Sequence, residues 1–293
     1  MRAIVTGSAG FIGSHLVDRL SADGWDVIGV DRKTGPSIES VATRGTVPSE
    51  DPVDAIFHLA SPVGPVGVLS QAGTIVPQVV KTSRIAGEWA LHYRCPLVDV
   101  STSEVYGSGG SDAEDDVCTF RPETSARKEY AIAKLAAETM LRNTSGLDVR
   151  IVRPFNVAGP RQSSEGGFVI PRFIEQARAG VPLTVYHPGS QRRAFTHVTD
   201  IVDGLVRAYA CGKPDEVYNL GNPDNSISMM ALANRVLAIL NIPGTVERGD
   251  PRTLHGPAFR EAPDKLPNAT KAMHELDWFP MRNLDQIIAD AAA

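Results

Sequence analysis

The sequence predicts an α/β fold in which helices cover both faces of a doubly wound parallel sheet. Three observations lead to this expectation: short apolar runs recur along the chain, amphipathic stretches separate most of them, and a glycine-rich turn follows the first run. Alternation of strands and helices favours parallel pairing, because each helix returns the chain to the edge where the previous strand began. The expected strands are Ala3–Thr6, Asp26–Val30, Ala55–Leu59, Leu97–Val100 and Val149–Val152.

The remaining segments are expected to be less regular. The stretch Lys33–Pro52 is polar and interrupted by glycine and proline, so we expect mostly loop, with room for one short strand. After Pro154, connections rich in glycine and proline become frequent. This change predicts a first domain of residues 1–154 and a smaller C-terminal α/β lobe of residues 155–293, some segments of which return to the first domain.

Helical periodicity appears twice in the second half, at Thr199–Tyr209 and at Ser228–Leu240. The stretch Gly249–Asn268 resembles a loop. No internal repeat is visible, so the chain is expected to be one large α/β domain with a smaller appendage.

Composition and charge argue against several classes of function. The chain of 293 residues has a formal net charge of −5, which gives no electrostatic reason to bind nucleic acid or an anionic membrane. Its three cysteines, Cys95, Cys118 and Cys211, are sparse and lack metal-ligand spacing, so we expect neither disulfides nor a metal site. The sequence has no apolar run of membrane-spanning length and no recognisable leader at Met1, so a cytoplasmic protein is expected.

The opening segment "TGSAGFIGSHL" predicts a dinucleotide site. Gly7, Gly10 and Gly13 stand between a strand and a helix, where free backbone N–H groups and the positive helix end attract a pyrophosphate. The next expected strand ends at Asp31, at the distance where a carboxylate receives ribose hydroxyls. The first domain is therefore expected to be of the Rossmann type. The carboxylate repels a 2′-phosphate, which favours NAD over NADP, although the adjacent Arg32 and Lys33 soften that preference.

Two further segments carry candidate chemistry. "VDVSTSEVYG" follows an expected strand and places Thr102, Ser103 and Glu104 at its carboxyl end, where open α/β sheets bind ligands. "EYAIAK" places Tyr130 and Lys134 four residues apart, on one face of a helix. A lysine ammonium beside a phenol is expected to lower the pKa of the phenol and make Tyr130 a usable base, with Thr102 as a hydrogen-bond partner of the same substrate oxygen.

With these segments, the sequence resembles the extended short-chain dehydrogenase/reductase family, in its group of NAD-dependent sugar-nucleotide epimerases, dehydratases and decarboxylases. The resemblance covers nearly the whole chain. It includes "HLAS" at His58–Ser61, "RPFNVAGPRQ" at Arg153–Gln162, "RRAFTHVTD" at Arg192–Asp200 and "VYNLGNP" at Val217–Pro223.

The resemblance implies a set of site residues. The implied catalytic residues are Thr102, Ser103, Glu104, Tyr130, Lys134 and Arg193. The implied cofactor contacts are Gly7, Gly10, Phe11, Ile12, Gly13, Asp31, Arg32, Leu59, Ala60, Ser61, Tyr130, Lys134 and Pro154. The implied substrate contacts are Ser103, Asn156, Arg161, Arg193 and Arg260. His58 is expected to be a packing residue, and no partner is evident for His197.

Within the family, the motifs are most similar to those of UDP-glucuronate decarboxylases, which form UDP-xylose. Glu104 suggests chemistry at C5 of the sugar, and Arg127, three residues before the tyrosine, matches the decarboxylases. Ala131, Ile132 and Ala133 are closer to epimerases and dehydratases, so a 4,6-dehydratase and a 4- or 5-epimerase remain alternatives. A non-catalytic dinucleotide-binding sensor is an alternative of another class. The patterns Val79–Tyr93 and Glu129–Asn143 resemble the helix pair through which this family forms homodimers.

Overall fold

The computed structural model describes residues 1–43, 47–107, 113–116, 118–120, 125–252 and 264–293. A six-stranded sheet forms its centre, and the strand order is β10-β5-β4-β3-β1-β2. All of its neighbouring strands are parallel. The bounds are β1 Arg2–Thr6, β2 Asp26–Val30, β3 Ala55–His58, β4 Leu97–Val100, β5 Val149–Pro154 and β10 Glu216–Leu220. The predicted doubly wound parallel fold is confirmed.

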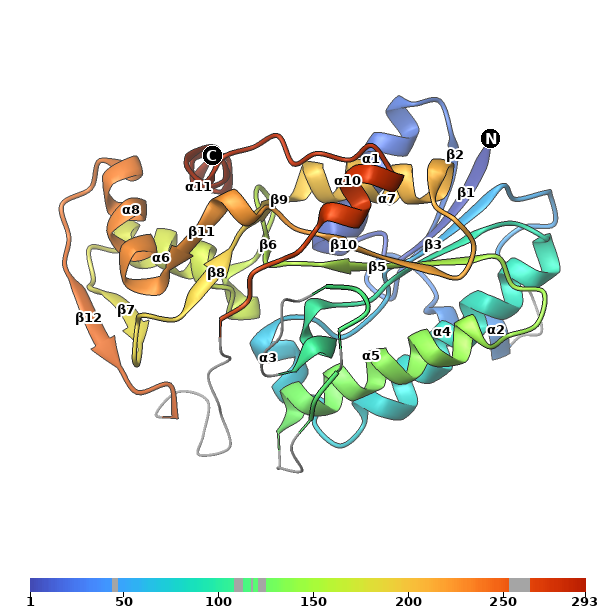
Figure 1. Cartoon of the computed structure of the whole chain (residues 1–293), viewed down its shortest axis with the longest axis horizontal. Helices are drawn as coiled ribbons and strands as arrows, with labels where there is room; N and C mark the ends of the chain where they lie inside the picture. Colours follow the sequence, from blue (N-terminus) through green and yellow to red (C-terminus); the bar gives the residue numbers. More distant parts are fainter. Residues whose placement is uncertain (44–46, 108–112, 117, 121–124, 253–263) are drawn as a thin grey trace.

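Helices cover both faces of this sheet (Figure 1). On one face lie α1 Phe11–Ala22, α7 Val198–Cys211 and α10 Thr270–Glu275, and on the other lie α2 Ile38–Thr43, α4 Ile75–Tyr93 and α5 Ala126–Arg142. Side chains alternate between the two faces along each strand. Val5 therefore packs with Leu16 and Leu205 in one apolar cluster, whereas Ile4 packs with Ile85 and Trp89 in the other.

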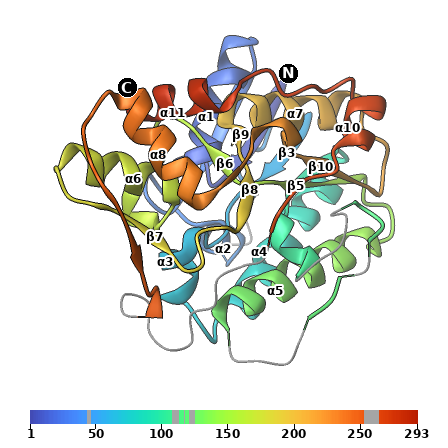
Figure 2. The ribbon, with the colours of Figure 1, turned by 60° about the vertical axis from the view of Figure 1, so that its left-hand side comes forward.

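A smaller lobe lies at one end of the sheet, where α6, α8 and α11 surround a separate apolar cluster (Figure 2). Its helices are α6 Val169–Arg178, α8 Met229–Leu240 and α11 Leu284–Ala292. Its paired strands are β7 Leu183–Tyr186 with β12 Val246–Gly249, β8 Arg192–Ala194 with β11 Ser226–Ser228, and β6 Val157–Ala158 with β9 Thr196–His197. Short helices complete the chain: α3 Gly64–Leu69, η1 Ser103–Tyr106, η2 Ser164–Gly166 and η3 Pro223–Asn225.

One segment differs from the sequence-based expectation. Residues 38–43 form α2, although the polar stretch around them suggests mostly loop or a short strand. Ile38 is 4 % exposed and belongs to the apolar cluster that includes Ile85, so contact with α4 stabilises a helix that is too short to be stable alone.

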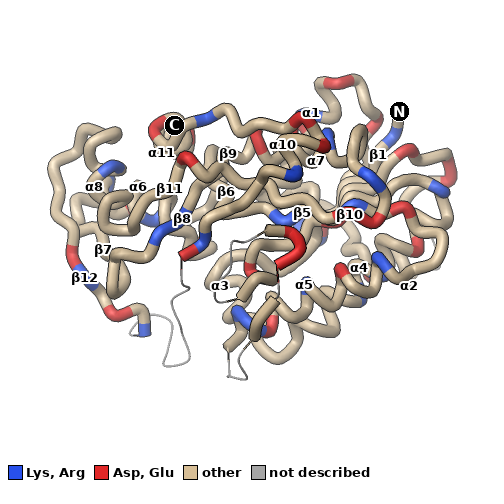
Figure 3. Tube along the Cα trace, in the orientation of Figure 1, with Lys and Arg blue, Asp and Glu red and all other residues tan. Residues whose placement is uncertain are grey.

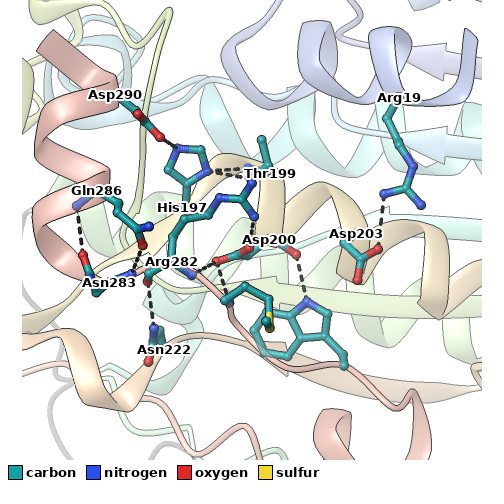
Figure 4. A network of polar contacts seen from close by, with 12 residues as sticks. Arg19, His197, Thr199, Asp200, Asp203, Asn222, Arg282, Asn283, Gln286 and Asp290 are labelled. Atoms are coloured by element: carbon teal, nitrogen blue, oxygen red, sulfur yellow. Dashed lines mark hydrogen bonds and ion pairs between the residues drawn. The ribbon is translucent and has the colours of Figure 1, made fainter. Parts of the chain in front are cut away.

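A polar network fastens the C-terminal segment to α7 (Figure 4). The buried Asp200 carboxylate accepts backbone N–H groups from Met281 and Arg282, each at 3.1 Å. His197 is the N-cap of α7, and its Nε2 lies 3.3 Å from the Asp290 carboxylate of α11. The structure thus supplies the partner that the sequence leaves unidentified for His197.

Charged residues of both signs are interspersed along the trace (Figure 3). Among the helices that the structure describes, none combines the length and the apolar character needed to cross a bilayer.

Candidate functional site

The glycine turn after β1 has a backbone that excludes side chains. Gly7 has φ of +72°, and a Cβ on Gly13 would lie 2.0 Å from the carbonyl oxygen of Gly7. Gly10 is the N-cap of α1, and no side chain caps that helix end. The first N–H groups of α1 are therefore available to an anion that approaches the bare backbone.

Asp31 follows β2 beside this turn. Its carboxylate accepts the backbone N–H of Ala9 at 3.0 Å and that of Lys33 at 2.8 Å. Two backbone donors from different segments fix the direction of the carboxylate. The carboxylate is consequently held at one end of the glycine turn, as is required if it accepts hydrogen bonds from the ribose hydroxyls of a dinucleotide.

A cavity of about 600 Å³ extends from the glycine turn and Asp31 to Tyr186 and Arg193 of the smaller lobe. Of the sequence-predicted residues, the following line it: Gly7, Gly10, Phe11, Ile12, Gly13, Asp31, Arg32, Leu59, Ala60, Ser61, Thr102, Ser103, Glu104, Tyr130, Lys134, Pro154, Asn156 and Arg193. Residues from both halves of the chain thus meet around one space, which is large enough for a ligand that extends between them.

One predicted substrate residue that the structure describes, Arg161, is not among those that line the cavity. Arg161 lies outside it, where its guanidinium is 2.9 Å from the Asp18 carboxylate and contacts the His15 ring. Its φ of 67° directs the chain through a left-handed position after Pro160. Arg260 lies outside the described residues.

Tyr130 lies in the middle of the cavity wall and is 8 % exposed. Burial, the largest effect, raises the pKa of its phenol above the usual value, and hydrogen bonding with Ser61 and Thr102 opposes this rise. The sequence-based expectation of a lowered phenol pKa is therefore wrong for the chain by itself. Desolvation of the phenolate, together with the carboxylate charges of Glu104 and Asp99, outweighs these hydrogen bonds.

Lys134 is 1 % exposed, and its Nζ donates to the carbonyl oxygen of Val100 at 2.7 Å. Burial lowers its pKa, and the carboxylates of Asp99 and Glu138 oppose this change. Burial also raises the pKa of Asp99 to about 6. This hydrogen bond fixes the ammonium at the cavity, which Lys134 lines together with Tyr130.

His58 ends β3 beneath the cavity and is completely buried. Its Nδ1 lies 2.8 Å from the hydroxyl of Thr6. Burial, with a smaller effect from the Lys134 charge, lowers its pKa to about 3. The imidazole is thus neutral at ordinary pH, which agrees with the expected packing role.

Glu104 occupies the other side of Tyr130 in η1, where cations surround its carboxylate. Arg127 binds it in a bidentate manner, with Nε to Oε2 at 2.6 Å and Nη2 to Oε1 at 2.7 Å. Lys265 pairs with the same carboxylate. Burial alone would raise the pKa of Glu104, but the two cations hold it well below the usual range.

Sequence reasoning does not identify Lys265, since it lies in a stretch with no helix or strand pattern. Arg172, Tyr186 and Gln191 are also missed; they line the end of the cavity in the smaller lobe. There the Arg172 guanidinium stacks 4.3 Å from the centre of the Tyr186 ring. Tyr186 and Gln191 precede the segment "RRAFTHVTD", whose resemblance to the family is the nearest signal in the sequence that points to this part of the site.

Asn156 and Arg193 approach the cavity from the smaller lobe. The Asn156 side chain donates to the carbonyl oxygen of Ala194 at 3.0 Å, and its φ of 34° is unusual for a residue other than glycine. Arg193 is 6 % exposed and its Nη1 donates to the carbonyl oxygen of Arg192 at 2.8 Å. A buried guanidinium beside a cavity is suited to a diphosphate or carboxylate.

The residues present fit a dinucleotide such as NAD. The glycine turn brings bare backbone to the cavity wall, because Gly7, Gly10 and Gly13 all line the cavity and no side chain caps the start of α1. The cavity continues from this turn past Asp31 in one direction and past Tyr130 in the other. The cavity thus has room for both the adenosine end and the nicotinamide end of the dinucleotide.

Comparison with known proteins gives a consistent result. Residues 3–221 match the NAD dependent epimerase/dehydratase family. UDP-glucuronic acid decarboxylase 2 of Arabidopsis thaliana is 36 % identical over 98 % of this chain, which spans 66 % of the length of that relative. UDP-N-acetyl-alpha-D-glucosaminuronate decarboxylase of Bacillus cytotoxicus is 30 % identical, with 97 % of this chain and 94 % of the relative aligned.

Among solved structures, the dTDP-glucose 4,6-dehydratase DesIV from Streptomyces venezuelae superposes with a TM-score of 0.80 and 27 % identity. The match covers 100 % of this chain and 96 % of DesIV, which was solved with NAD bound. The glycine turn, the cavity and both comparisons agree with the resemblance found in the sequence. The chain belongs to the NAD dependent epimerase/dehydratase family.

Proposed function

We propose that this protein is an NAD-dependent enzyme that decarboxylates a nucleotide-linked uronic acid, with UDP-glucuronate as the substrate. The observation that carries the proposal is the arrangement on one cavity wall of Tyr130, Thr102 and the cation-bound carboxylate of Glu104. The similarity to UDP-glucuronic acid decarboxylases over nearly the whole chain supports it.

The residues proposed to hold the cofactor are those of the glycine turn for the pyrophosphate, Asp31 for the adenosine ribose, and Tyr130 with Lys134 for the nicotinamide ribose. Bound NAD would accept the hydride from C4 of the sugar and return it, and its positive nicotinamide ring would favour the phenolate of Tyr130. Residues 1–154 are thus proposed as the cofactor domain and residues 155–293 mainly as the substrate lobe.

In this proposal, Tyr130 accepts the proton of the C4 hydroxyl while Thr102 binds the same oxygen. The resulting C4 ketone lies β to the C5 carboxylate, so loss of carbon dioxide leaves an enolate at C4 and C5. Hydrogen bonds from Tyr130 and Thr102 stabilise that enolate oxygen, and reprotonation at C5 follows. Ser103 and Arg193 are proposed to contact the substrate, and Asn156 to bind its diphosphate together with Arg193.

Cationic side chains stand near the proposed reaction centre. Arg127 and Lys265 both pair with the carboxylate of Glu104, and Arg193, which lines the cavity, acts on Lys265 through its charge. Such surroundings are suited to a substrate that carries a carboxylate and a diphosphate.

Product analysis tests the proposal. Incubation with UDP-glucuronate and NAD is expected to release carbon dioxide and form a UDP-pentose, measured by mass spectrometry. A stable 4-keto-6-deoxy product from a UDP- or dTDP-hexose would instead indicate a dehydratase, and a product of unchanged mass would indicate an epimerase. No product from any nucleotide sugar, together with tight NAD binding, would indicate a dinucleotide sensor.

Assembly and location are proposed from the family resemblance. The helices α4 and α5 pack against each other, and we propose that they form a four-helix contact with a second copy in a cytoplasmic homodimer. Sedimentation or light scattering that gives a monomer mass at all concentrations would contradict the dimer.

Cofactor choice gives a further prediction for Asp31. Asp31→Ala is expected to weaken NAD binding by about tenfold and to improve the ratio of NADP to NAD affinity, because it removes the ribose acceptor and the charge that repels a 2′-phosphate. Calorimetry with both dinucleotides measures this ratio. Asp23→Ala, at the C-cap of α1, is a matched control that should leave both affinities unchanged. A wild-type preference for NADP would contradict the assignment.

A further inference from the structure

Lys265 is fixed by its backbone alongside β8. Its N–H donates to the carbonyl oxygen of Arg192 at 3.2 Å, and its own carbonyl oxygen accepts the N–H of Ala194 at 3.3 Å. The preceding Asp264 carboxylate accepts the N–H of Arg192 at 2.7 Å. These hydrogen bonds attach the backbone of Lys265 to β8, so Lys265 is positioned as part of the smaller lobe.

The side chain of Lys265 extends from there to a residue of the other half of the chain. It is 4 % exposed, and its ammonium pairs with Oε1 of Glu104. Burial lowers the pKa of Lys265 to about 8, and Glu104 opposes this change. A buried ammonium is costly unless an anion compensates its charge, and the carboxylate of Glu104 is the anion that the ion pair supplies.

The contacts that the described residues make with Glu104 leave one hydrogen-bond acceptor position of its carboxylate unoccupied. Among the described residues, Oε1 accepts a hydrogen bond from Arg127 Nη2 and forms an ion pair with the ammonium of Lys265, whereas Oε2 accepts one hydrogen bond, from Arg127 Nε. A carboxylate offers about four acceptor positions, so one remains on Oε2. Glu104 lines the cavity, and that position is available to a water or a sugar hydroxyl near the reacting carbons.

We propose that Lys265 is a positioning residue of the active site: from the smaller lobe, it holds Glu104 ionised and fixes the direction of its last acceptor position. The inference rests on the proposed function, because it is the C5 chemistry of a uronic acid that uses Glu104. The proposal implies that Glu104 is correctly placed in the active site only when β8 packs against η1.

The pH dependence of the variants follows from the charges that face Glu104. These are Arg127 on α5, Lys265 beside β8 and the phenol of Tyr130, with Arg193 acting on Lys265. In the wild type, two cations keep the pKa of Glu104 below its usual range, so the carboxylate is ionised at pH 5 and above. Removing the Lys265 charge raises this pKa, so the ionised form is lost at a higher pH than in the wild type.

The test compares Lys265→Met, Lys265→Gln and Lys265→Arg in the NAD-loaded enzyme with UDP-glucuronate. For Lys265→Met, kcat is expected to fall by about tenfold or more with KM changed by less than about threefold, and the acid limb of its pH profile should lie at a higher pH than that of the wild type. Lys265→Arg should restore the wild-type pH profile. Lys265→Gln gives the same test if the methionine variant does not fold.

Lys271→Met is the matched control, because Lys271 also anchors the C-terminal segment through an ion pair, 2.6 Å from Glu216, but does not line the cavity. It should leave the pH profile unchanged. If the neutral Lys265 variants keep the wild-type profile, or if the arginine variant shifts it as they do, the proposal is overturned.

A second measurement does not depend on turnover. Infrared titration of the NAD-loaded protein, with Glu104→Gln as the subtraction reference, follows the protonated carboxyl group of Glu104 directly. The group should titrate at least about one unit higher in Lys265→Gln than in the wild type. An equal titration in both proteins would overturn the proposal. Absence of carbon dioxide release by the wild type would instead refute the proposed reaction, and the infrared result would still decide the role of Lys265.

Discussion

Tyr130→Phe is expected to lower kcat for UDP-glucuronate by about 10²–10⁴-fold, the usual contribution of a positioned general base. The substitution removes the phenolic oxygen and keeps the ring that packs against α3 and α4 residues. NAD affinity should change by less than about threefold, because the glycine turn and Asp31 are untouched. Steady-state kinetics and calorimetry on the same preparation measure the two effects.

Tyr209→Phe is the matched control for this substitution. Tyr209 lies on α7, where its ring packs against those of Trp25 and Phe57 on the opposite face of the sheet from Tyr130. The Tyr209→Phe variant should keep wild-type turnover. If Tyr130→Phe retained turnover within about tenfold of the wild type, another group would have to accept the C4 proton.

The sequence predicts the central sheet because the relevant information is local. The strands are short apolar runs, and the glycine turn lies between a strand and a helix. Across this turn, the spacing of the apolar residues changes from every second residue to about every 3.6 residues. Gly13 could be assigned to the turn from its spacing alone, and the Cβ contact of 2.0 Å explains why only glycine fits there. The helix α2 was not predicted, since its stability comes from packing of Ile38 against distant residues.

The same distinction applies to the site. Tyr130 and Lys134 are four residues apart, so helical geometry alone brings both to the cavity. The contact between Glu104 and Lys265 depends on how β8 docks against η1, and no periodicity in the sequence encodes that docking. Arg161 shows the converse case, because a left-handed backbone position directs it to Asp18 although its motif suggested a substrate contact.

The sequence also does not predict whether the pKa of Tyr130 is raised or lowered. The spacing suggests a lysine charge beside the phenol, but the sign of the shift depends on how deeply the phenol is buried. In the structure, burial is the largest effect and the Lys134 ammonium donates to a backbone carbonyl group. Three-dimensional packing therefore decides between two opposing effects that the sequence presents together.

Glu104→Gln is expected to separate the two halves of the proposed reaction. Glutamine keeps the size of the side chain and loses its charge, so Arg127 and Lys265 lose their shared anion. Oxidation at C4 depends on Tyr130 and Thr102 and should remain within about tenfold of the wild type, whereas carbon dioxide release should fall by about 10²-fold or more. The variant should then accumulate reduced nicotinamide in a single turnover, followed by its absorbance.

Glu88→Gln is the matched control, because Glu88 forms an exposed ion pair with Arg84 on α4 and is not among the residues that line the cavity. It should release carbon dioxide at the wild-type rate and accumulate no reduced nicotinamide beyond the wild-type level. A 4-epimerase has no step at C5, so in such an enzyme Glu104→Gln would slow turnover without this accumulation. If the wild type releases no carbon dioxide and the Glu104 variant accumulates no reduced nicotinamide, the role of Glu104 after C4 oxidation is refuted, and the dehydratase and epimerase reactions become the ones to test.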